Sequence, residues 1–448
     1  MRFISIVLVA ALFSGCALQN KPKVAFVSEA NKEPKTNQQF ILEDLEEVPQ
    51  DIKYYTKNLP LKDISQMQDD YEKNYFAAWN MKKIKYTIED AKWAFRVFES
   101  ENVYGENLLL RDKNFFQDML EQSNFEDYDK FSRKALTLQY SNLRAFPTHK
   151  PLFRDPSIAG EGFPFDYLQN SGVNANTPIY VSHYSKNKQW VFVCTNYTFG
   201  WLKKDEVVFL DEKYTTIWKD AKQVRVTQEG IPLYDSKGVG LFNTRLGTMF
   251  PVINEDDDNY TVLAVSSYKN NQAYFHHALI PKYAASEKYL QLNTNNINKI
   301  VSQLSKSKYG WGGLYKQRDC SSTLMDLFSP FGIYLPRNSS QQAKVGKVFD
   351  LKGMNDLEKE KFIKNNAIPF QTLLYRKGHI VLYVGVYNGE IIVFQNMWGI
   401  RTKHNEKEGR IIIGRSIFSS LHLGKKLKSY EHEADLLKNI ESMNIVTE

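Results

Sequence analysis

The spacing of apolar residues divides the chain into a helical part and a strand-rich part. Over residues 40–140, apolar side chains recur with the 3.6-residue period of a helix, as in 91–98 and 115–120. This period predicts a mostly helical N-terminal domain over residues 40–140. After Phe146, short aromatic and β-branched runs alternate with Asn, Gly, Asp and Pro. That pattern is typical of the strands and turns of small barrels.

Two barrel-sized segments fit within the strand-rich part. They span residues 141–213, which include the apolar run 190–194, and residues 214–285. Each has the length of an SH3-like barrel, so the sequence predicts two such barrels in succession. We assign most of their aromatic rings to the barrel cores, with binding of a partner as the alternative.

The remaining residues, 286–448, are predicted to form a further domain that opens with a helix. Thr294 is the expected N-cap of this helix. The apolar positions that share one face of it are Ile297, Ile300, Val301 and Leu304.

The first residues of the chain have the pattern of an export signal. Met1 and Arg2 precede an apolar run over residues 3–13, which is far shorter than the ~20 residues of a membrane-spanning helix. Small residues then lead to Cys16, an arrangement that resembles the bacterial lipoprotein box, in which the cysteine is lipidated. Residues 1–16 are therefore the predicted signal, and Cys16 is the predicted membrane anchor. An ordinary secretory signal is the alternative.

The segment after Cys16 is predicted to be a flexible tether. Residues 17–39 are rich in Lys, Asn and Pro and poor in apolar residues. Ala17 stands where an aspartate would favour retention at the inner membrane. By resemblance to this sorting signal, we expect the protein at the periplasmic face of the outer membrane.

Composition excludes several classes of function. The 448 residues suffice for about three domains of ~150 residues each. Lys and Arg number 58 and Asp and Glu 51, and a net charge of +7 over this length is too dilute for a nucleic-acid-binding surface. The histidines lack metal-ligand spacing and no phosphate-binding loop is present, so we expect no metal and no cofactor. We also expect a monomer that does not bind nucleic acid.

The cysteines indicate the chemistry of the C-terminal domain. Three cysteines cannot form a disulfide framework. Cys194 lies in an apolar strand-like run, and we interpret it as a buried side chain. Cys320 begins a predicted helix, whose unpaired N–H groups lower the pKa of a thiol and can stabilise an oxyanion. Cys320 is therefore the predicted nucleophile.

A histidine at the start of a predicted strand is the candidate base. His379 opens an apolar run that is followed by an Asn-Gly turn and a second strand. Cysteine on a helix followed by histidine on a strand is the papain-like order. A third polar group must orient the imidazole, and the hairpin register selects it. A two-residue loop puts Asn396 on the face of His379, whereas a three-residue loop puts Gln395 there, and the sequence permits both.

Short motifs in the C-terminal region form a family pattern. They are Tyr-Gly-Trp-Gly-Gly at 309–313, Asp-Cys-Ser-Ser at 319–322, Leu-Pro-Arg-Asn-Ser-Ser-Gln at 335–341, Gly-His at 378–379 and Gln-Asn-Met-Trp-Gly at 395–399. Over residues 294–423 the chain resembles the NlpC-type family of bacterial cell-wall cysteine peptidases. The whole layout is similar to the γ-D-glutamyl-L-diamino acid endopeptidase subgroup. The resemblance implies a multidomain α+β protein with a helical domain, two SH3-like β-barrels and a papain-like α+β catalytic domain.

The resemblance also implies roles for individual residues. Cys320 would attack the γ-D-glutamyl to meso-diaminopimelate bond of peptidoglycan stem peptides, and His379 would pair with the thiolate and move the protons. Gln395 stands where related sequences usually carry histidine. Asp319 and Ser321 would receive the free amine of the stem peptide. Further expected substrate-binding residues are Tyr309, a candidate oxyanion donor, and Trp311.

Two alternatives to a hydrolase remain open at this point. A catalytically decayed lipoprotein could bind the wall through its SH3-type domains, with Gln395 in place of histidine as its support. An acyl or amide transferase could resolve the same thioester with an amine. By resemblance to the enzymes of this family, the first SH3-type domain is expected to narrow the substrate cleft of the catalytic domain.

Overall fold

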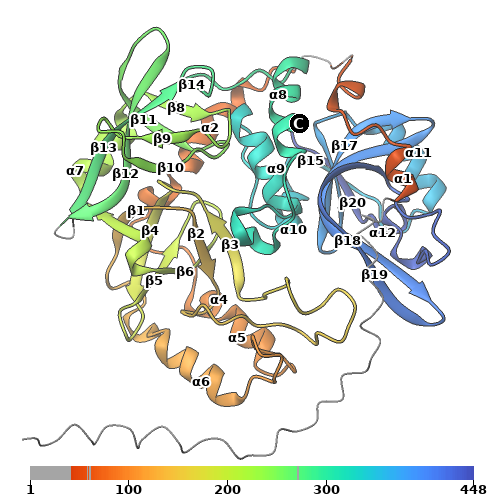
Figure 1. Cartoon of the computed structure of the whole chain (residues 1–448), viewed down its shortest axis with the longest axis horizontal. Helices are drawn as coiled ribbons and strands as arrows, with labels where there is room; N and C mark the ends of the chain where they lie inside the picture. Colours follow the sequence, from red (N-terminus) through yellow and green to blue (C-terminus); the bar gives the residue numbers. More distant parts are fainter. Residues whose placement is uncertain (1–41, 58, 60–61, 270–271) are drawn as a thin grey trace, which may run out of the picture. The chain divides into compact units, whose positions relative to one another are not determined.

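The computed structural model describes residues 42–57, 59, 62–269 and 272–448. The predicted signal, Cys16, the whole predicted tether and its boundary at residues 39/40 therefore lie outside the described residues. Figure 1 shows the order of the elements along the chain. Within the described ranges, no helix has the length and apolar character needed to cross a membrane.

Short helices form the N-terminal part of the described chain. Their bounds are α1 Glu43–Glu46, α2 Ser65–Tyr75, α3 Ala77–Asn80, α4 Ile88–Ala91, α5 Trp93–Phe98 and α6 Lys113–Gln122. The Asp112 side chain caps α6 by accepting from the N–H of Phe115. Trp79 is fully buried and its indole donates to the carbonyl of Ala135 at 2.9 Å, so these helices pack against the first sheet.

The first β domain is a seven-stranded antiparallel sheet in the order β3-β2-β6-β5-β4-β1-β7. The strands are β1 Arg133–Thr137, β2 Ser141–Arg144, β3 Gln169–Val173, β4 Pro178–Tyr184, β5 Trp190–Cys194, β6 Phe199–Lys203 and β7 Val207–Leu210. β1 pairs with both β4 and β7, so the sheet begins before the predicted boundary at residues 140/141. The segment before β1 is short and rich in aromatic residues, so the apolar periodicity of the sequence does not mark where the strand begins.

The second β domain follows helix α7 (Glu212–Asp220) and contains a five-stranded sheet in the order β13-β12-β11-β8-β14. Strands β9 and β10 form a separate pair. The bounds are β8 Gln223–Val226, β9 Pro232–Tyr234, β10 Gly240–Asn243, β11 Met249–Glu255, β12 Asn259–Lys269, β13 Gln272–Pro281 and β14 Ala285–Ser286.

The C-terminal domain packs helices against a six-stranded sheet in the order β15-β20-β16-β17-β18-β19. The helices are α8 Thr294–Leu304, α9 Cys320–Phe328, α10 Ser339–Gln342, α11 Asp356–Asn366 and α12 Leu436–Asn439. The strands are β15 Lys347–Asp350, β16 Thr372–Arg376, β17 His379–Tyr387, β18 Glu390–His404, β19 Lys407–Ser420 and β20 Ser442–Ile445. Asn293 caps α8, so the prediction that Thr294 does so is wrong by one residue.

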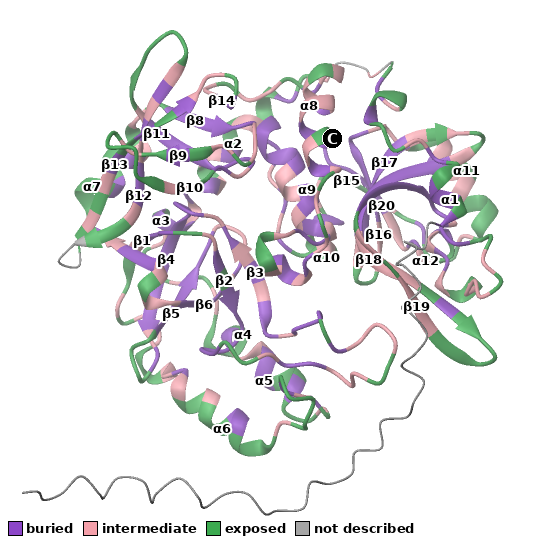
Figure 2. Cartoon of the chain, viewed as in Figure 1, coloured by how far each residue is buried: buried purple, intermediate pink, exposed green. Residues whose placement is uncertain are grey.

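One apolar core joins α8 and α9 to the sheet. Leu324 and Leu327 of α9 pack with Ile380 and Leu382 of β17, and all four side chains are buried. Figure 2 shows buried residues along both α9 and β17. Burial of these apolar faces fixes the start of α9 next to the start of β17. The succession of helices, two β domains and a mixed C-terminal domain agrees with the predicted fold class.

Candidate active site

Cys320 occupies the first position of helix α9, as the sequence predicts. Asp319 is the N-cap and accepts from the N–H of Ser322 at 2.8 Å, while the Ser322 hydroxyl accepts from the N–H of Asp319 at 2.9 Å. This capping box fixes where the helix begins. The backbone N–H of Cys320 has no acceptor within the helix, because no residue precedes it by a full helical turn.

The Cys320 thiol is protonated at neutral pH. Burial and the neighbouring Asp319 carboxylate raise its pKa to about 12, although the N–H groups of Ile380 and Ser321 and the charge of Arg337 act in the opposite direction. The Ser321 N–H at the helix start lowers the pKa of this thiol as expected, but the net shift is upward. Desolvation outweighs the helix dipole at this position.

His379 is held in one tautomer by Gln395. The imidazole Nε2 lies 2.7 Å from Gln395 Oε1, and the Gln395 amide nitrogen donates to the Ser419 hydroxyl at 2.7 Å. Because the amide oxygen can only accept, Nε2 carries the hydrogen and Nδ1 is the free base. Burial lowers the pKa of His379 to about 4, against the raising effect of Gln395, so the imidazole is neutral near pH 7.

The hairpin register that brings Gln395 to His379 depends on a bulge. The loop is the two residues Asn388-Gly389, since Tyr387 pairs with Glu390. A register shift between Tyr383 and Gly385 then moves the pairing by one residue, so that Leu382 faces Phe394. The two-residue loop is thus correct, but its predicted consequence, Asn396 on the face of His379, is wrong.

Asn396 has a different position and different contacts. It is fully buried and its amide donates to the carbonyl of Arg318 at 3.1 Å and to the Thr323 hydroxyl at 3.2 Å. These bonds tie β18 to the start of α9. Asn396 therefore positions the helix that carries Cys320 and does not contact the imidazole.

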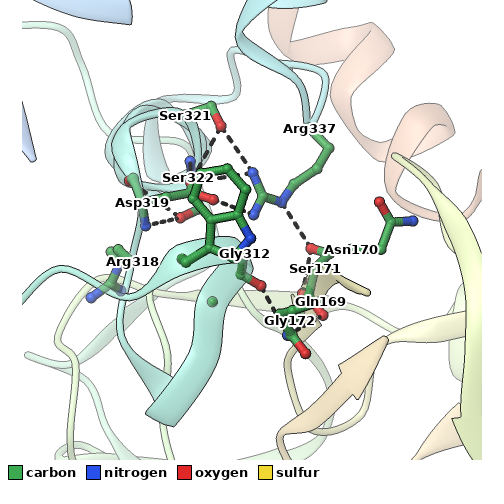
Figure 3. Close-up of polar contacts among 12 residues, drawn as sticks. Gln169, Asn170, Ser171, Gly172, Gly312, Arg318, Asp319, Ser321, Ser322 and Arg337 are labelled. Carbon is green, nitrogen blue, oxygen red and sulfur yellow. Dashed lines mark hydrogen bonds and ion pairs between the residues drawn. The ribbon is translucent and has the colours of Figure 1, made fainter. Parts of the chain in front are cut away.

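Asp319 forms a buried ion pair with Arg337 (Figure 3). The guanidinium donates to both carboxylate oxygens, at 2.6 and 3.2 Å, and to the Ser321 hydroxyl at 2.9 Å. It also donates through Nε to the hydroxyl of Ser171, on β3 of the first β domain, at 2.8 Å. The Arg337 charge holds the pKa of Asp319 below its ordinary value even though burial opposes this shift.

These contacts do not fit the prediction that Asp319 and Ser321 receive a free amine. The Asp319 charge is already compensated by a guanidinium, and the Ser321 hydroxyl donates to Asp319 Oδ1 at 3.2 Å. An incoming ammonium group would have to displace Arg337 from a fully desolvated pair. The sequence motif contains Arg337, but only the fold shows that it reaches Asp319.

Tyr309 and Trp311 lie between the C-terminal domain and the first β domain. Burial and the nearby Cys320 raise the pKa of Tyr309 well above its ordinary value, so its hydroxyl stays protonated beside the thiol. The Trp311 indole donates to the carbonyl of Asp166 at 2.9 Å, and its ring meets those of Phe165 and Tyr167 edge-on. Trp311 thus holds the loop before Cys320 against the first β domain.

A glycine in this loop allows the two domains to approach closely. Gly312 has φ +56°, and a Cβ there would lie 2.6 Å from the carbonyl oxygen of Gln169. Gln169 in turn donates to the Gly312 carbonyl at 3.0 Å, and Tyr140 donates to that of Gly313 at 2.7 Å (Figure 3 labels Gln169 and Gly312). A side chain at position 312 would separate the first β domain from the cysteine loop.

Both cysteines of the described chain are free thiols. Cys194 is fully buried in β5, as expected, and burial raises its pKa. Across the described ranges, no three His, Cys, Asp or Glu side chains come together as a metal site.

Four family models match consecutive parts of the chain. Residues 306–409, which include Cys320, His379 and Gln395, match the NlpC/P60 family. This is an NlpC/P60 domain. Residues 5–128 match the N-terminal NLPC_P60 stabilising domain, residues 151–203 an SH3 domain of SH3b1 type, and residues 211–257 an SH3 domain of SH3b2 type. The predicted succession of a helical region, two SH3-like domains and a catalytic-type domain is confirmed.

One solved structure shares the succession of the NlpC/P60 domain and its neighbours along the chain, and another match is weaker. An NlpC/P60 endopeptidase from Photobacterium damselae subsp. piscicida is 24% identical, with a TM-score of 0.76, and the match covers 90% of this chain and 98% of that one. An NlpC/P60 family protein from Bacillus cereus is 15% identical, with a TM-score of 0.41, over 62% of this chain and 82% of that one. No curated protein matches the sequence. The family match supports a cysteine peptidase.

Proposed function

We propose that this protein is a peptidoglycan hydrolase that cleaves the γ-D-glutamyl to meso-diaminopimelate bond of wall stem peptides. The observation that carries the proposal is the 2.7 Å contact that orients His379 through Gln395, beside a cysteine at the start of α9. This is the arrangement that nucleophilic acyl transfer requires. The bond itself is inferred from the resemblance of the sequence motifs.

The proposed reaction begins from a neutral thiol and a neutral imidazole. Nδ1 of His379 accepts the thiol proton as the Cys320 sulfur attacks the γ-carbonyl carbon of D-glutamate. The resulting oxyanion accepts from the backbone N–H of Cys320 and from the Tyr309 hydroxyl, which burial keeps protonated. Gln395 compensates the charge that forms on the imidazole, since its oxygen faces Nε2–H.

The intermediate then collapses to a thioester. The carbon–nitrogen bond breaks, and the imidazolium gives its proton to the leaving amine of diaminopimelate. In the second half, His379 takes a proton from water, the hydroxide attacks the thioester carbonyl, and the sulfur leaves and regains a proton from the imidazolium. The γ-carboxylate of D-glutamate is the product.

We further propose that Cys16 anchors the enzyme by lipid to the periplasmic face of the outer membrane. The support is the sequence around Cys16 and the Ala17 that follows it. Growth in labelled fatty acid would show incorporation into the wild-type chain and none into a Cys16→Ala chain. Equal labelling of both would contradict this part of the proposal.

Digestion of two substrates tests the proposed function. The soluble form, starting after Cys16, is incubated with L-Ala-γ-D-Glu-diaminopimelate tripeptide and with intact wall sacculi, and the products are read by mass. The enzyme is expected to release L-Ala-D-Glu from the tripeptide, and Cys320→Ala is expected to release none. Binding of sacculi without any cleavage would favour the decayed wall-binding protein, and products joined to an amine would favour the transferase.

A further inference from the structure

A cavity of about 210 Å³ opens beside His379. His379 and Gln395 are among the residues that line it. The long hairpin of β18 and β19, prominent in Figure 1, and the segment 430–439 form its walls. The sequence motifs do not account for this cavity, because it is built largely from residues beyond them.

Three arginines from different strands line the cavity: Arg376, Arg401 and Arg410. Burial, and next the charge of Arg401, lower the pKa of both Arg376 and Arg410. Arg401 has one acidic partner, Glu408 at 3.5 Å, and both of these side chains are about 45% exposed. The three cations thus lie close enough to repel one another.

Within the described residues, the arginines make few direct polar contacts, although Glu441 lies near Arg376, and Glu408 and Glu161 lie near Arg410. Arg410 donates to the carbonyl of Ala159 at 3.1 Å, but its Nε is buried without an acceptor. Arg376 makes no side-chain hydrogen bond or ion pair to the described part of the chain. A cluster of partly desolvated guanidinium groups with free donors is the setting that binds a carboxylate.

The lining of the cavity also includes three acids, two of which are already paired. Asp435 accepts from His422 at 2.8 Å, and Glu433 accepts from Lys438 at 2.6 Å. Glu431 makes only a contact with the backbone N–H of Glu433, at 3.2 Å, among the residues described. Glu431 therefore offers a carboxylate in the same cavity as the three arginines.

His379 lines the cavity and also meets the leaving group in the proposed reaction. In the proposed reaction the imidazole delivers a proton to the leaving nitrogen, so the residue attached to that nitrogen must lie against His379. The cavity is bounded by His379 but not by Cys320. A side chain that extends past the imidazole from the leaving residue would enter it.

The geometry points to a subsite for the zwitterionic far end of the leaving diamino acid, with its carboxylate on Arg376 and Arg410 and its ammonium on Glu431. This inference rests on the proposed function, since that function identifies the leaving residue. Diaminopimelate carries an ammonium and a carboxylate at the far end of its side chain, whereas lysine carries the ammonium alone. The arginines therefore select between the two residues, and Glu431 does not.

Cleavage of two tripeptides tests this assignment. The substrates are L-Ala-γ-D-Glu-diaminopimelate and the same peptide ending in lysine, and the variants are Arg410→Gln, Arg376→Gln and Glu431→Gln. Each arginine variant is expected to lower kcat/KM for the diaminopimelate peptide by about 10-fold and to leave the lysine peptide unchanged. Glu431→Gln is expected to lower both. Arg96→Gln, an exposed arginine of α5 outside the cavity, is the matched control.

A binding measurement separates failure of the subsite from failure of the proposed function. Free meso-diaminopimelate and lysine are titrated into the full Cys320→Ala chain, with and without Arg410→Gln, by calorimetry. Arginine-dependent binding of diaminopimelate without any cleavage would uphold the subsite and contradict the hydrolase. Cleavage with equal losses for both peptides in folded arginine variants, or no preference for diaminopimelate in the wild-type chain, would overturn the subsite.

Discussion

At the scale of single residues, burial decides the charge states of the candidate nucleophile Cys320 and the candidate base His379. The Cys320 pKa is raised to about 12 and that of His379 is lowered to about 4, in both cases chiefly by desolvation. Each shift favours the neutral form, so the resting pair is a thiol and an imidazole. The family resemblance implies a pair of Cys320 thiolate and His379 imidazolium, and these shifts disfavour that pair in the protein without substrate.

The pH dependence of kcat/KM tests this charge assignment. The imidazole must be neutral to accept the thiol proton, and its lowered pKa keeps it neutral well below pH 6.5. We expect activity to fall only as the pH approaches about 4 and to show no decline up to about pH 9. An alkaline decline near pH 8, where an imidazolium would lose its proton, would instead indicate a preformed thiolate–imidazolium pair.

Gln395 is expected to act by orienting His379. Gln395→Ala removes the acceptor for Nε2–H, so the imidazole can rotate or change tautomer, and kcat should fall by about 10²-fold. Gln395→His restores the residue that related sequences usually carry and should retain most of the activity. Steady-state kinetics with thermal unfolding of both variants measures this. Full activity of a folded Gln395→Ala enzyme would contradict the orienting role.

At the scale of elements, two local irregularities set the active site. The capping box of Asp319 and Ser322 starts α9 at Cys320, and the bulge at Val384 turns β17 so that His379 faces Gln395. Without the bulge, the two-residue turn would present Asn396 to the histidine. The positions of Cys320 and of His379 beside Gln395 therefore depend on one helix cap and one extra strand residue.

The Asp319–Arg337 pair is expected to stabilise the fold rather than bind substrate. Asp319→Asn keeps an N-cap acceptor but leaves the Arg337 charge buried and uncompensated, at a cost of about 3–5 kcal/mol in the free energy of unfolding. Denaturant unfolding at pH 7 measures this loss, and the double variant with Arg337→Met should recover part of it. Since the folded-state pKa of Asp319 is depressed, its contribution should persist above pH 4 and vanish only at lower pH.

The sequence predicts the elements that carry the site better than the contacts between them. Cys320 at a helix start and His379 at a strand start follow from apolar periodicity and turn residues, which are local signals. The choice between Gln395 and Asn396 depends on a bulge in a run of apolar residues, which has no local signal. The Arg337 contact with Asp319 and Ser171 joins three distant segments, and only the packed fold brings them together.

At the scale of the whole described chain, the first β domain is part of the active-site structure. Trp311 donates to the carbonyl of Asp166, and Arg337 donates to the hydroxyl of Ser171. Gln169 donates to the carbonyl of Gly312. The loop before Cys320 is therefore held from outside the NlpC/P60 domain. Loss of the first β domain should disturb the cysteine loop even though it carries no catalytic residue.

A buried histidine makes the stability of this assembly depend on pH. His183 of β4 bridges the Ser182 hydroxyl and the carbonyl of Ser123 at the end of α6, and burial lowers its pKa to about 4. The unfolded chain binds a proton near pH 6.5 and the folded chain only near pH 4. Stability should therefore fall by about 3 kcal/mol between these values as the pH is lowered.

Chemical unfolding at pH 7 and pH 4.5 measures this loss. A His183→Gln chain should lose less stability than the wild type over the same interval, because glutamine does not titrate. Equal losses in the two chains would show that His183 is not the group responsible.

The most direct test of the account is digestion of L-Ala-γ-D-Glu-diaminopimelate in ¹⁸O-labelled water. The account predicts free diaminopimelate and an L-Ala-D-Glu product that carries one ¹⁸O in its γ-carboxylate, with neither product from the Cys320→Ala chain. Release of alanine, an unlabelled dipeptide, or undiminished cleavage by Cys320→Ala would contradict hydrolysis of this bond through Cys320.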